Sequence, residues 1–163
     1  MCLAKFDNES PITASELHPD GLIFITGDNE GMLKVWDLPN QKKLLDLEGS
    51  DYTIKSIAIS EDGVHLATID DNKEQSIAKL WDLRKPNNSI NIQLPDDSKA
   101  NKLRFNSFGN YLGVAGVKTS IFNIKSLTST TIELESSSSD IAFGINSTYI
   151  ATSSLDRNLR LYY

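Results

Sequence analysis

The sequence predicts an all-β protein of four blades, each an antiparallel sheet, on three observations. The first is a repeat: Leu-Lys-Val-Trp-Asp-Leu around Trp36 returns as Lys-Leu-Trp-Asp-Leu around Trp81, 45 residues later. Two weaker copies place Phe122 and Tyr162 at further intervals of 41 and 40 residues. A period near forty residues is typical of a β-propeller, in which each repeat is one blade. We take as structural repeat positions Trp36, Asp37, Trp81, Asp82, Phe122, Tyr162 and Asp156.

The other two observations are the turns and the strands that precede each aromatic. Glycine or asparagine supplies a tight reversal at 18–21, 60–63 and 107–110, and the fourth copy has 145–148 at that place. Each turn leads into an apolar, β-branched stretch that is suited to lie between blades. We expect four-stranded blades at 12–47, 54–94, 100–134 and 139–163, with outer strands at 43–47, 89–94 and 130–134 and none after Tyr163.

Residues 3–6 are expected to form an extra outer strand ahead of the first blade. This strand would either complete the last blade and close a small four-bladed ring, or belong to a blade that the chain lacks. We favour the second arrangement, in which the four blades are part of a larger ring, because propellers protect their sheet edges by closure.

Length, composition and charge exclude several classes of function. The 163 residues are 39% hydrophobic and 23% charged, which is typical of a soluble globular domain. With 16 Lys plus Arg against 22 Asp plus Glu, the net charge of -6 repels a phosphate backbone, so direct nucleic-acid binding is not expected. The single cysteine, Cys2, has no disulfide or zinc-ligand partner, and no apolar run is long enough for a signal peptide or a membrane span. We therefore expect an intracellular protein without membrane contact.

The Trp-Asp endings resemble the WD-repeat family, whose propellers usually close with seven blades. Three stretches sharpen the resemblance: 17–24 with 36–38, then 79–85, and last 155–160, in this order and spacing. Together they are similar to the C-terminal propeller of the pre-mRNA-processing factor 19 family of spliceosome-associated U-box ubiquitin ligases. The resemblance implies a nuclear propeller that binds substrates or partners, mainly splicing-complex proteins, in pre-mRNA splicing and in DNA repair. It implies no catalysis by these blades, because the family's U-box and coiled coil precede the propeller and are not in this chain.

The family's buried network of His, Asp, Ser or Thr, and Trp is mostly absent from this sequence. Its aspartate survives only as Asp156, six residues before Tyr162, while Glu30, Gln75 and Gly116 hold the equivalent places. A buried polar network stabilises a fold only when every member is satisfied. We therefore expect apolar packing to hold the blades together.

The sequence offers no catalytic, metal or cofactor site. His18 and His65 are the two histidines, and both are adjacent to expected turns, which favours structural roles. No nucleophile elbow, phosphate-binding glycine loop or paired-cysteine motif occurs. The acidic stretch 70–74 has Gln75 where a calcium loop needs glycine, so we expect a solvated hairpin. Two alternatives stay open: a scaffold propeller of another intracellular assembly, and a propeller hydrolase or lyase.

Charge is the remaining indication of function, because it is expected to differ between the two rims of the blades. Loops that join the second and third strands, and loops between blades, should open on one acidic rim. We expect that rim to attract a basic partner such as an RNA-binding splicing protein. The alternative, that these charges only keep the loops solvated, is equally open. The expected binding residues are Asp28, Glu30, Asp51, Asp70, Asp71, Asp96, Asp97 and Asp156; the opposite rim carries Lys42, Lys43, Arg84, Lys85 and Lys125.

Overall fold

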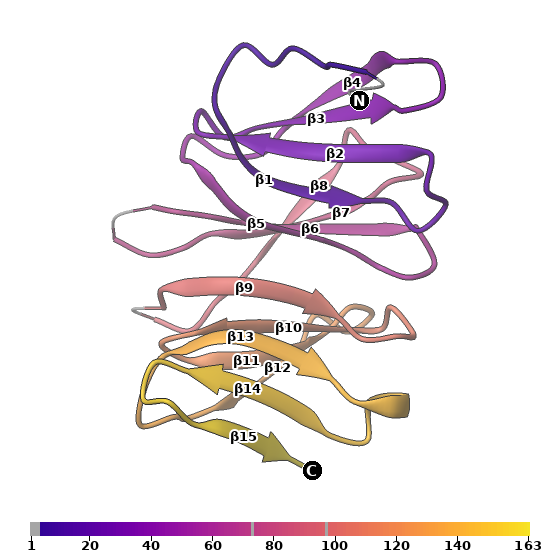
Figure 1. Ribbon diagram of the computed structural model, residues 1–163. Helices are drawn as coiled ribbons and strands as arrows, with labels where there is room; N and C mark the ends of the chain where they lie inside the picture. The colour runs from indigo at the N-terminus through magenta and orange to yellow at the C-terminus, as the bar shows by residue number, and fades with distance from the viewer. Residues whose placement is uncertain (1–3, 73, 97) are drawn as a thin grey trace.

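The computed structural model describes residues 4–72, 74–96 and 98–163, which form four antiparallel sheets (Figure 1). Blade 1 contains β1 Ile12–Leu17, β2 Ile23–Asp28, β3 Met32–Asp37 and β4 Lys42–Glu48. Blade 2 contains β5 Ile54–Ile59, β6 His65–Asp70, β7 Ala78–Asp82 and β8 Ser89–Ile92. Blade 3 contains β9 Ala100–Phe105, β10 Tyr111–Gly116, β11 Thr119–Asn123 and β12 Ser129–Ile132. Blade 4 contains β13 Ser138–Phe143, β14 Ile150–Ser154 and β15 Leu159–Tyr162, with a single 3-10 turn at Ile145–Ser147.

Every blade is a meander in which each strand pairs with the next strand along the chain. The four repeat aromatics occupy one register position on the third strand. Trp36 lies opposite Phe24, Trp81 opposite Leu66, Phe122 opposite Leu112 and Tyr162 opposite Ile150. The predicted all-β class is thereby confirmed, and the aromatics occupy equivalent places in the strand pairing. A register shift near the start of the first strand recurs in all four blades, a bulge-like feature that the aromatic spacing does not predict.

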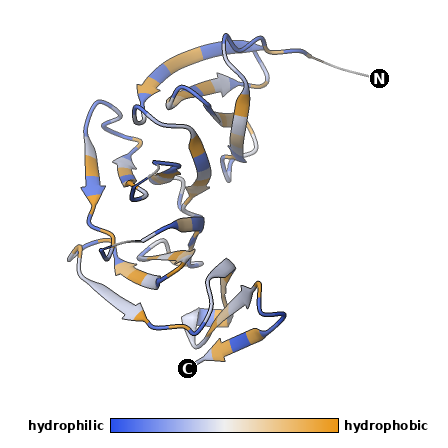
Figure 2. Cartoon of the chain, turned by 90° about the vertical axis from the view of Figure 1, so that its left-hand side faces the viewer, coloured by the Kyte–Doolittle hydropathy of each residue, from blue (hydrophilic) through white to orange (hydrophobic). Residues whose placement is uncertain are grey.

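The blades follow one another along a curved path, with the inner strands β1, β5, β9 and β13 in contact (Figure 2). The chain runs from blade 1 at the top of Figure 1 to blade 4 at the bottom. No strand of blade 1 pairs with a strand of blade 4 in the described residues. The sheets therefore form an open stack, as expected for part of a propeller, and the seven-bladed ring stays a prediction.

Apolar side chains between successive blades form the core. Ile25, Leu33 and Ile54 are fully buried between blades 1 and 2, and Ile69 and Leu103 between blades 2 and 3. Strand alternation produces this arrangement, because every second side chain of a blade points at the neighbouring blade. Blades 1 and 2 approach each other closely: a Cβ atom on Gly27 would lie 2.6 Å from the Ile54 side chain.

The segment ahead of blade 1 differs from the sequence prediction. Residues 4–6 form no strand, and Leu3, the first residue of the expected strand, lies outside the described residues. Instead the ring of Phe6 meets the ring of Trp36 edge-on, with centroids 5.4 Å apart. The prediction of a strand was wrong here because a short apolar run fits an edge strand and a packing anchor equally well.

Candidate functional site

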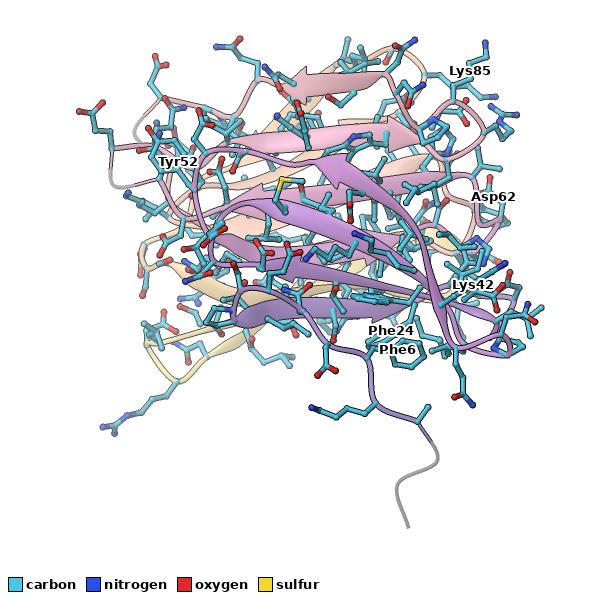
Figure 3. All side chains as sticks on the ribbon, turned by 90° about the horizontal axis from the view of Figure 1, so that it is seen from above. Phe6, Phe24, Lys42, Tyr52, Asp62 and Lys85 are labelled. Carbon is cyan, nitrogen blue, oxygen red and sulfur yellow. The ribbon has the colours of Figure 1, made fainter. Side chains whose placement is uncertain are left out.

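The loops with the expected acidic excess lie together on one rim, because hydrogen bonds tie the turns to the loops between blades. Ser50 N donates to Gly31 O at 3.0 Å, and Asp71 N donates to Thr53 O at 2.8 Å. These contacts connect the β2–β3 turn, the β4–β5 loop and the β6–β7 turn into one surface. Figure 3 shows Tyr52 at this rim, and Lys42, Asp62 and Lys85 at the opposite one.

Two of the expected binding residues, Asp28 and Asp70, are buried and do not face a partner. Their exposed fractions are 3% and 2%. Asp28 Oδ1 accepts hydrogen bonds from the backbone N–H groups of Glu30 and Met32, each at 3.0 Å. Asp70 Oδ1 accepts from Ile77 N at 2.7 Å, and burial raises the pKa of this carboxyl. Both aspartates therefore close the turns that follow β2 and β6.

The exposed acidic residues gather where blades 1 and 2 meet. Glu30, Asp51 and Asp71 are exposed and stand on the three loops joined by the hydrogen bonds above, so we call them the acidic patch. Asp96 is also exposed, but Lys118 Nζ donates to its backbone carbonyl at 3.0 Å and brings a positive charge beside it. Lys99 Nζ likewise donates to the backbone carbonyl of Asn72, next to Asp71, so the acidic patch also has a positive charge beside it.

The last two expected binding residues do not add to this patch. Asp156 stands in the β14–β15 turn and is ion-paired with Arg160, with both side chains 24% exposed. That guanidinium holds the pKa of Asp156 well below its usual range. Its charge is therefore already neutralised locally. Asp97 lies outside the described residues.

The repeat positions have structural roles in this arrangement. Trp36, Trp81 and Phe122 are buried between strands, with exposed fractions of 6%, 2% and 3%. Asp37 accepts hydrogen bonds from Asn40 N and Nδ2, which closes the β3–β4 turn. Tyr162 is half-buried, at the register position of the other aromatics.

Asp82 has the same role as Asp37 in blade 2. Its two carboxylate oxygens accept from Arg84 Nε at 2.8 Å and from Arg84 Nη2 at 2.6 Å. This bidentate pairing holds the pKa of Asp82 well below its usual range. The aspartate of each well-formed Trp-Asp ending therefore fixes a turn on the rim opposite the acidic patch.

His18 also has a structural role. His18 Nε2 lies 3.0 Å from the carbonyl oxygen of Gly63, which links the first turns of blades 1 and 2, and its Nδ1 lies 3.0 Å from Asp20 Oδ1. Within the described residues, no group of three or more His, Cys, Asp or Glu side chains is placed to hold a metal ion. That part of the chain also has no helix with the length and apolar character needed to cross a membrane.

Comparisons with known proteins agree with this architecture. The WD domain, G-beta repeat family matches residues 1–37 and 127–162. Pre-mRNA-processing factor 19 of Oryza sativa subsp. japonica is 36% identical, over 92% of this chain and 29% of its own length. Pre-mRNA-processing factor 19 homolog 2 of Arabidopsis thaliana is 33% identical, over 99% of this chain and 31% of its own length. Pre-mRNA-processing factor 19 of Homo sapiens is 37% identical, over 93% of this chain and 30% of its own length.

The chain thus spans 29–31% of the length of these curated relatives. This chain has the features of WD repeats: the repeat spacing, the four meander sheets and the equivalent aromatic positions. The polar side chains at the repeat positions close turns or pack in the interior. The chain is therefore a WD40 protein-interaction domain, homologous to pre-mRNA-processing factor 19 across nearly its whole length.

Proposed function

We propose that these blades bind protein partners of a ubiquitin ligase that acts in pre-mRNA splicing in the nucleus. The observation that carries the proposal is the homology to proteins named pre-mRNA-processing factor 19, over 92–99% of the chain. The ligase activity and a part in DNA repair are proposed from the family resemblance, with the transfer of ubiquitin carried out by a part of the protein other than these blades. In this proposal the blades are part of a seven-bladed ring and select what the ligase acts on or assembles with.

The acidic patch of Glu30, Asp51 and Asp71 is the surface proposed to receive a basic partner. These carboxylates are exposed, and they form no ion pair in the described part of the chain. Exposed charges of one sign steer an oppositely charged protein and set its orientation more than they raise its affinity. A basic segment of a splicing protein has the complementary charge.

The experiment that tests this proposal is affinity purification of the tagged protein from nuclear extract, with quantitative mass spectrometry of the recovered proteins. We expect enrichment of splicing-complex proteins. The triple variant Glu30→Lys, Asp51→Lys, Asp71→Lys should recover them at least about tenfold less well, because it reverses the field that steers association. Glu61→Lys, an exposed acid on the opposite rim, is the control and should recover them as the wild type does.

Two outcomes separate the parts of the proposal. If a folded wild-type sample recovers no splicing proteins, the assignment to a splicing ligase is wrong. If the triple variant recovers them as well as the wild type, the assignment stands and the acidic patch is not the docking surface. Circular dichroism of each variant establishes that a loss of binding is not a loss of folding.

A further inference from the structure

A pocket of about 350 Å³ lies on the inner surface of the stack, where the first strands of blades 1, 2 and 3 follow one another (Figure 2). All of its lining comes from β1, β5 and β9, and the loops of the two rims contribute none. We call it the inner pocket. Its polar lining consists of Thr13, Ser15, Lys55, Ser56 and Lys102. The pocket therefore offers ammonium and hydroxyl groups and no carboxylate.

The two lysines bring their positive charges to the inner pocket from neighbouring blades. Lys55 reaches from β5 to β9, where its Nζ donates to Asn101 Oδ1 at 3.0 Å, and Asn101 directly precedes Lys102. Neither lysine forms an ion pair with a described residue. Two like charges that line one pocket repel each other, and an anion between them removes this repulsion.

The other charged side chains of the four inner strands do not neutralise the two lysines. They are Glu16, Arg104 and Asp140. Arg104 Nε lies 4.0 Å from Asp140 Oδ1, so these two charges balance each other. Glu16 follows Ser15, but it does not line the pocket and forms no ion pair with either lysine. The inner strands thus carry an excess of positive charge, although the whole chain has a net charge of -6.

Hydrogen bonds between the blades hold the walls of the inner pocket in place. Thr13 Oγ1 donates to the carbonyl oxygen of Ile54 at 2.6 Å and joins β1 to β5. Ser56 Oγ accepts from Leu103 N at 3.3 Å and joins β5 to β9. Each inner strand is also an edge strand of its sheet, and such an edge presents unpaired backbone N–H groups. The pocket is therefore formed before a ligand enters, with neutral donors beside the two lysines.

We propose that the inner pocket binds a small anion with two or more phosphate groups, held between Lys55 and Lys102. The volume lies in the range of about 300–1,000 Å³ that is typical of small-molecule sites. Each ammonium group has three N–H donors, and its hydrogen bonds to phosphate oxygens are stronger than those between neutral groups. Two phosphate groups offer one to each lysine. This site is separate from the acidic patch and takes a ligand of opposite charge.

Isothermal titration calorimetry with pyrophosphate, at constant ionic strength, tests this inference. We expect pyrophosphate to bind the wild type, and Lys55→Gln and Lys102→Gln each to weaken binding at least about tenfold, because each removes a charge-assisted contact. Lys125→Gln, an exposed lysine outside the pocket, is the matched control and should bind as the wild type does. Glu16→Gln should raise the affinity about two- to fivefold, since it removes a nearby negative charge.

A second probe separates a free anion from a phosphorylated protein. A short peptide with two adjacent phosphoserines should bind more weakly than pyrophosphate, and tighter binding of the peptide would overturn the assignment to a small anion. Absence of binding by the folded wild type, or an equal loss in Lys125→Gln and Lys102→Gln, also overturns it. The triple variant of the acidic patch should bind pyrophosphate, and Lys102→Gln should recover splicing proteins as the wild type does. Failure of this site and failure of the proposed function are therefore distinguishable.

Discussion

The indole Nε1 of Trp36 donates a hydrogen bond to the hydroxyl oxygen of Thr26 at 2.8 Å inside blade 1, and both side chains are buried. In blade 4 the equivalent pair is Tyr162 and Thr152, because Tyr162 lies opposite Ile150 as Trp36 lies opposite Phe24. A tyrosine has no N–H at the place of the indole nitrogen. Accordingly the Thr152 hydroxyl is buried without a hydrogen-bond partner among the described residues.

Thr26→Val should therefore destabilise the protein. Valine has nearly the same shape as threonine, but it leaves the indole N–H of Trp36 buried without an acceptor, which costs about 1–3 kcal/mol. The free energy of unfolding, measured by urea denaturation, should fall by that amount. The control is Thr152→Val, which removes a hydroxyl that already lacks a partner and should be neutral or stabilising. Equal losses in the two variants would contradict the role assigned to the Trp36 hydrogen bond.

The sequence was sufficient for the repeat and for the register of the aromatics, because Trp36 and Trp81 mark the same point of two successive blades. It was not sufficient to predict that Asp28 and Asp70 are buried. The residues that follow these two aspartates, such as Asn29, Glu30 and Asp71, have the composition of a solvated loop. Only the folded structure shows that each aspartate carboxylate accepts backbone N–H groups in the interior. A useful indication was present: both residues are the last of a mainly apolar strand, at the place where a turn begins.

A cavity lined by Ile25 and Leu83 between blades 1 and 2 was also outside the reach of sequence analysis. The alternation of Ile23, Ile25 and Phe24 predicts which side chains face a neighbouring blade, but not how much of that face the neighbour covers. Coverage depends on the short outer strand β8 and on the turn at 83–86, whose positions are set by the packing of two blades. A feature that depends on the distance between two sheets is not encoded in the periodicity of either one.

The buried carboxyl of Asp70 should make stability depend on pH. Burial raises its pKa in the folded protein above the unfolded value of about 3.9, so the folded state holds the proton more tightly. Stability due to this group is therefore greatest at low pH and is lost as the pH rises through the raised folded pKa. Asp70→Asn keeps an acceptor for Ile77 N and removes the titration.

We expect the stability of Asp70→Asn to increase relative to that of the wild type as the pH rises through this range, and the difference to level off above it. Urea unfolding of both proteins at several values between about pH 3.5 and 7 measures this difference. Parallel stability curves for the two proteins would show that Asp70 titrates alike in the folded and unfolded states, contrary to the expectation.

The contact between Gly27 and Ile54 should make blade spacing sensitive to a single methyl group. A Cβ at Gly27 would lie 2.6 Å from Cγ2 and 2.7 Å from Cβ of Ile54, a branched side chain that is fully buried. Gly27→Ala should therefore lower the free energy of unfolding by about 1–3 kcal/mol. Gly113→Ala in blade 3 is the comparison, because its nearest contact is the terminal Cδ1 of Ile141, at 2.8 Å, which moves more easily. A larger loss in Gly113→Ala than in Gly27→Ala would contradict this argument.

The strand β15 should cause the protein to self-associate. It is an edge strand of blade 4 in the described residues, and its side chains Leu159 and Leu161 are 70% and 49% exposed. An exposed apolar edge offers unpaired backbone groups and apolar area to a second copy, and lysines on such an edge suppress this pairing. We therefore expect the double variant Leu159→Lys, Leu161→Lys to sediment as a smaller species than the wild type at the same concentration.

Leu155→Lys, in the preceding turn and 81% exposed, changes charge and apolar area but not the edge, so it should sediment nearly as the wild type does. Unchanged association of the double variant would mean that contacts elsewhere hold the copies together.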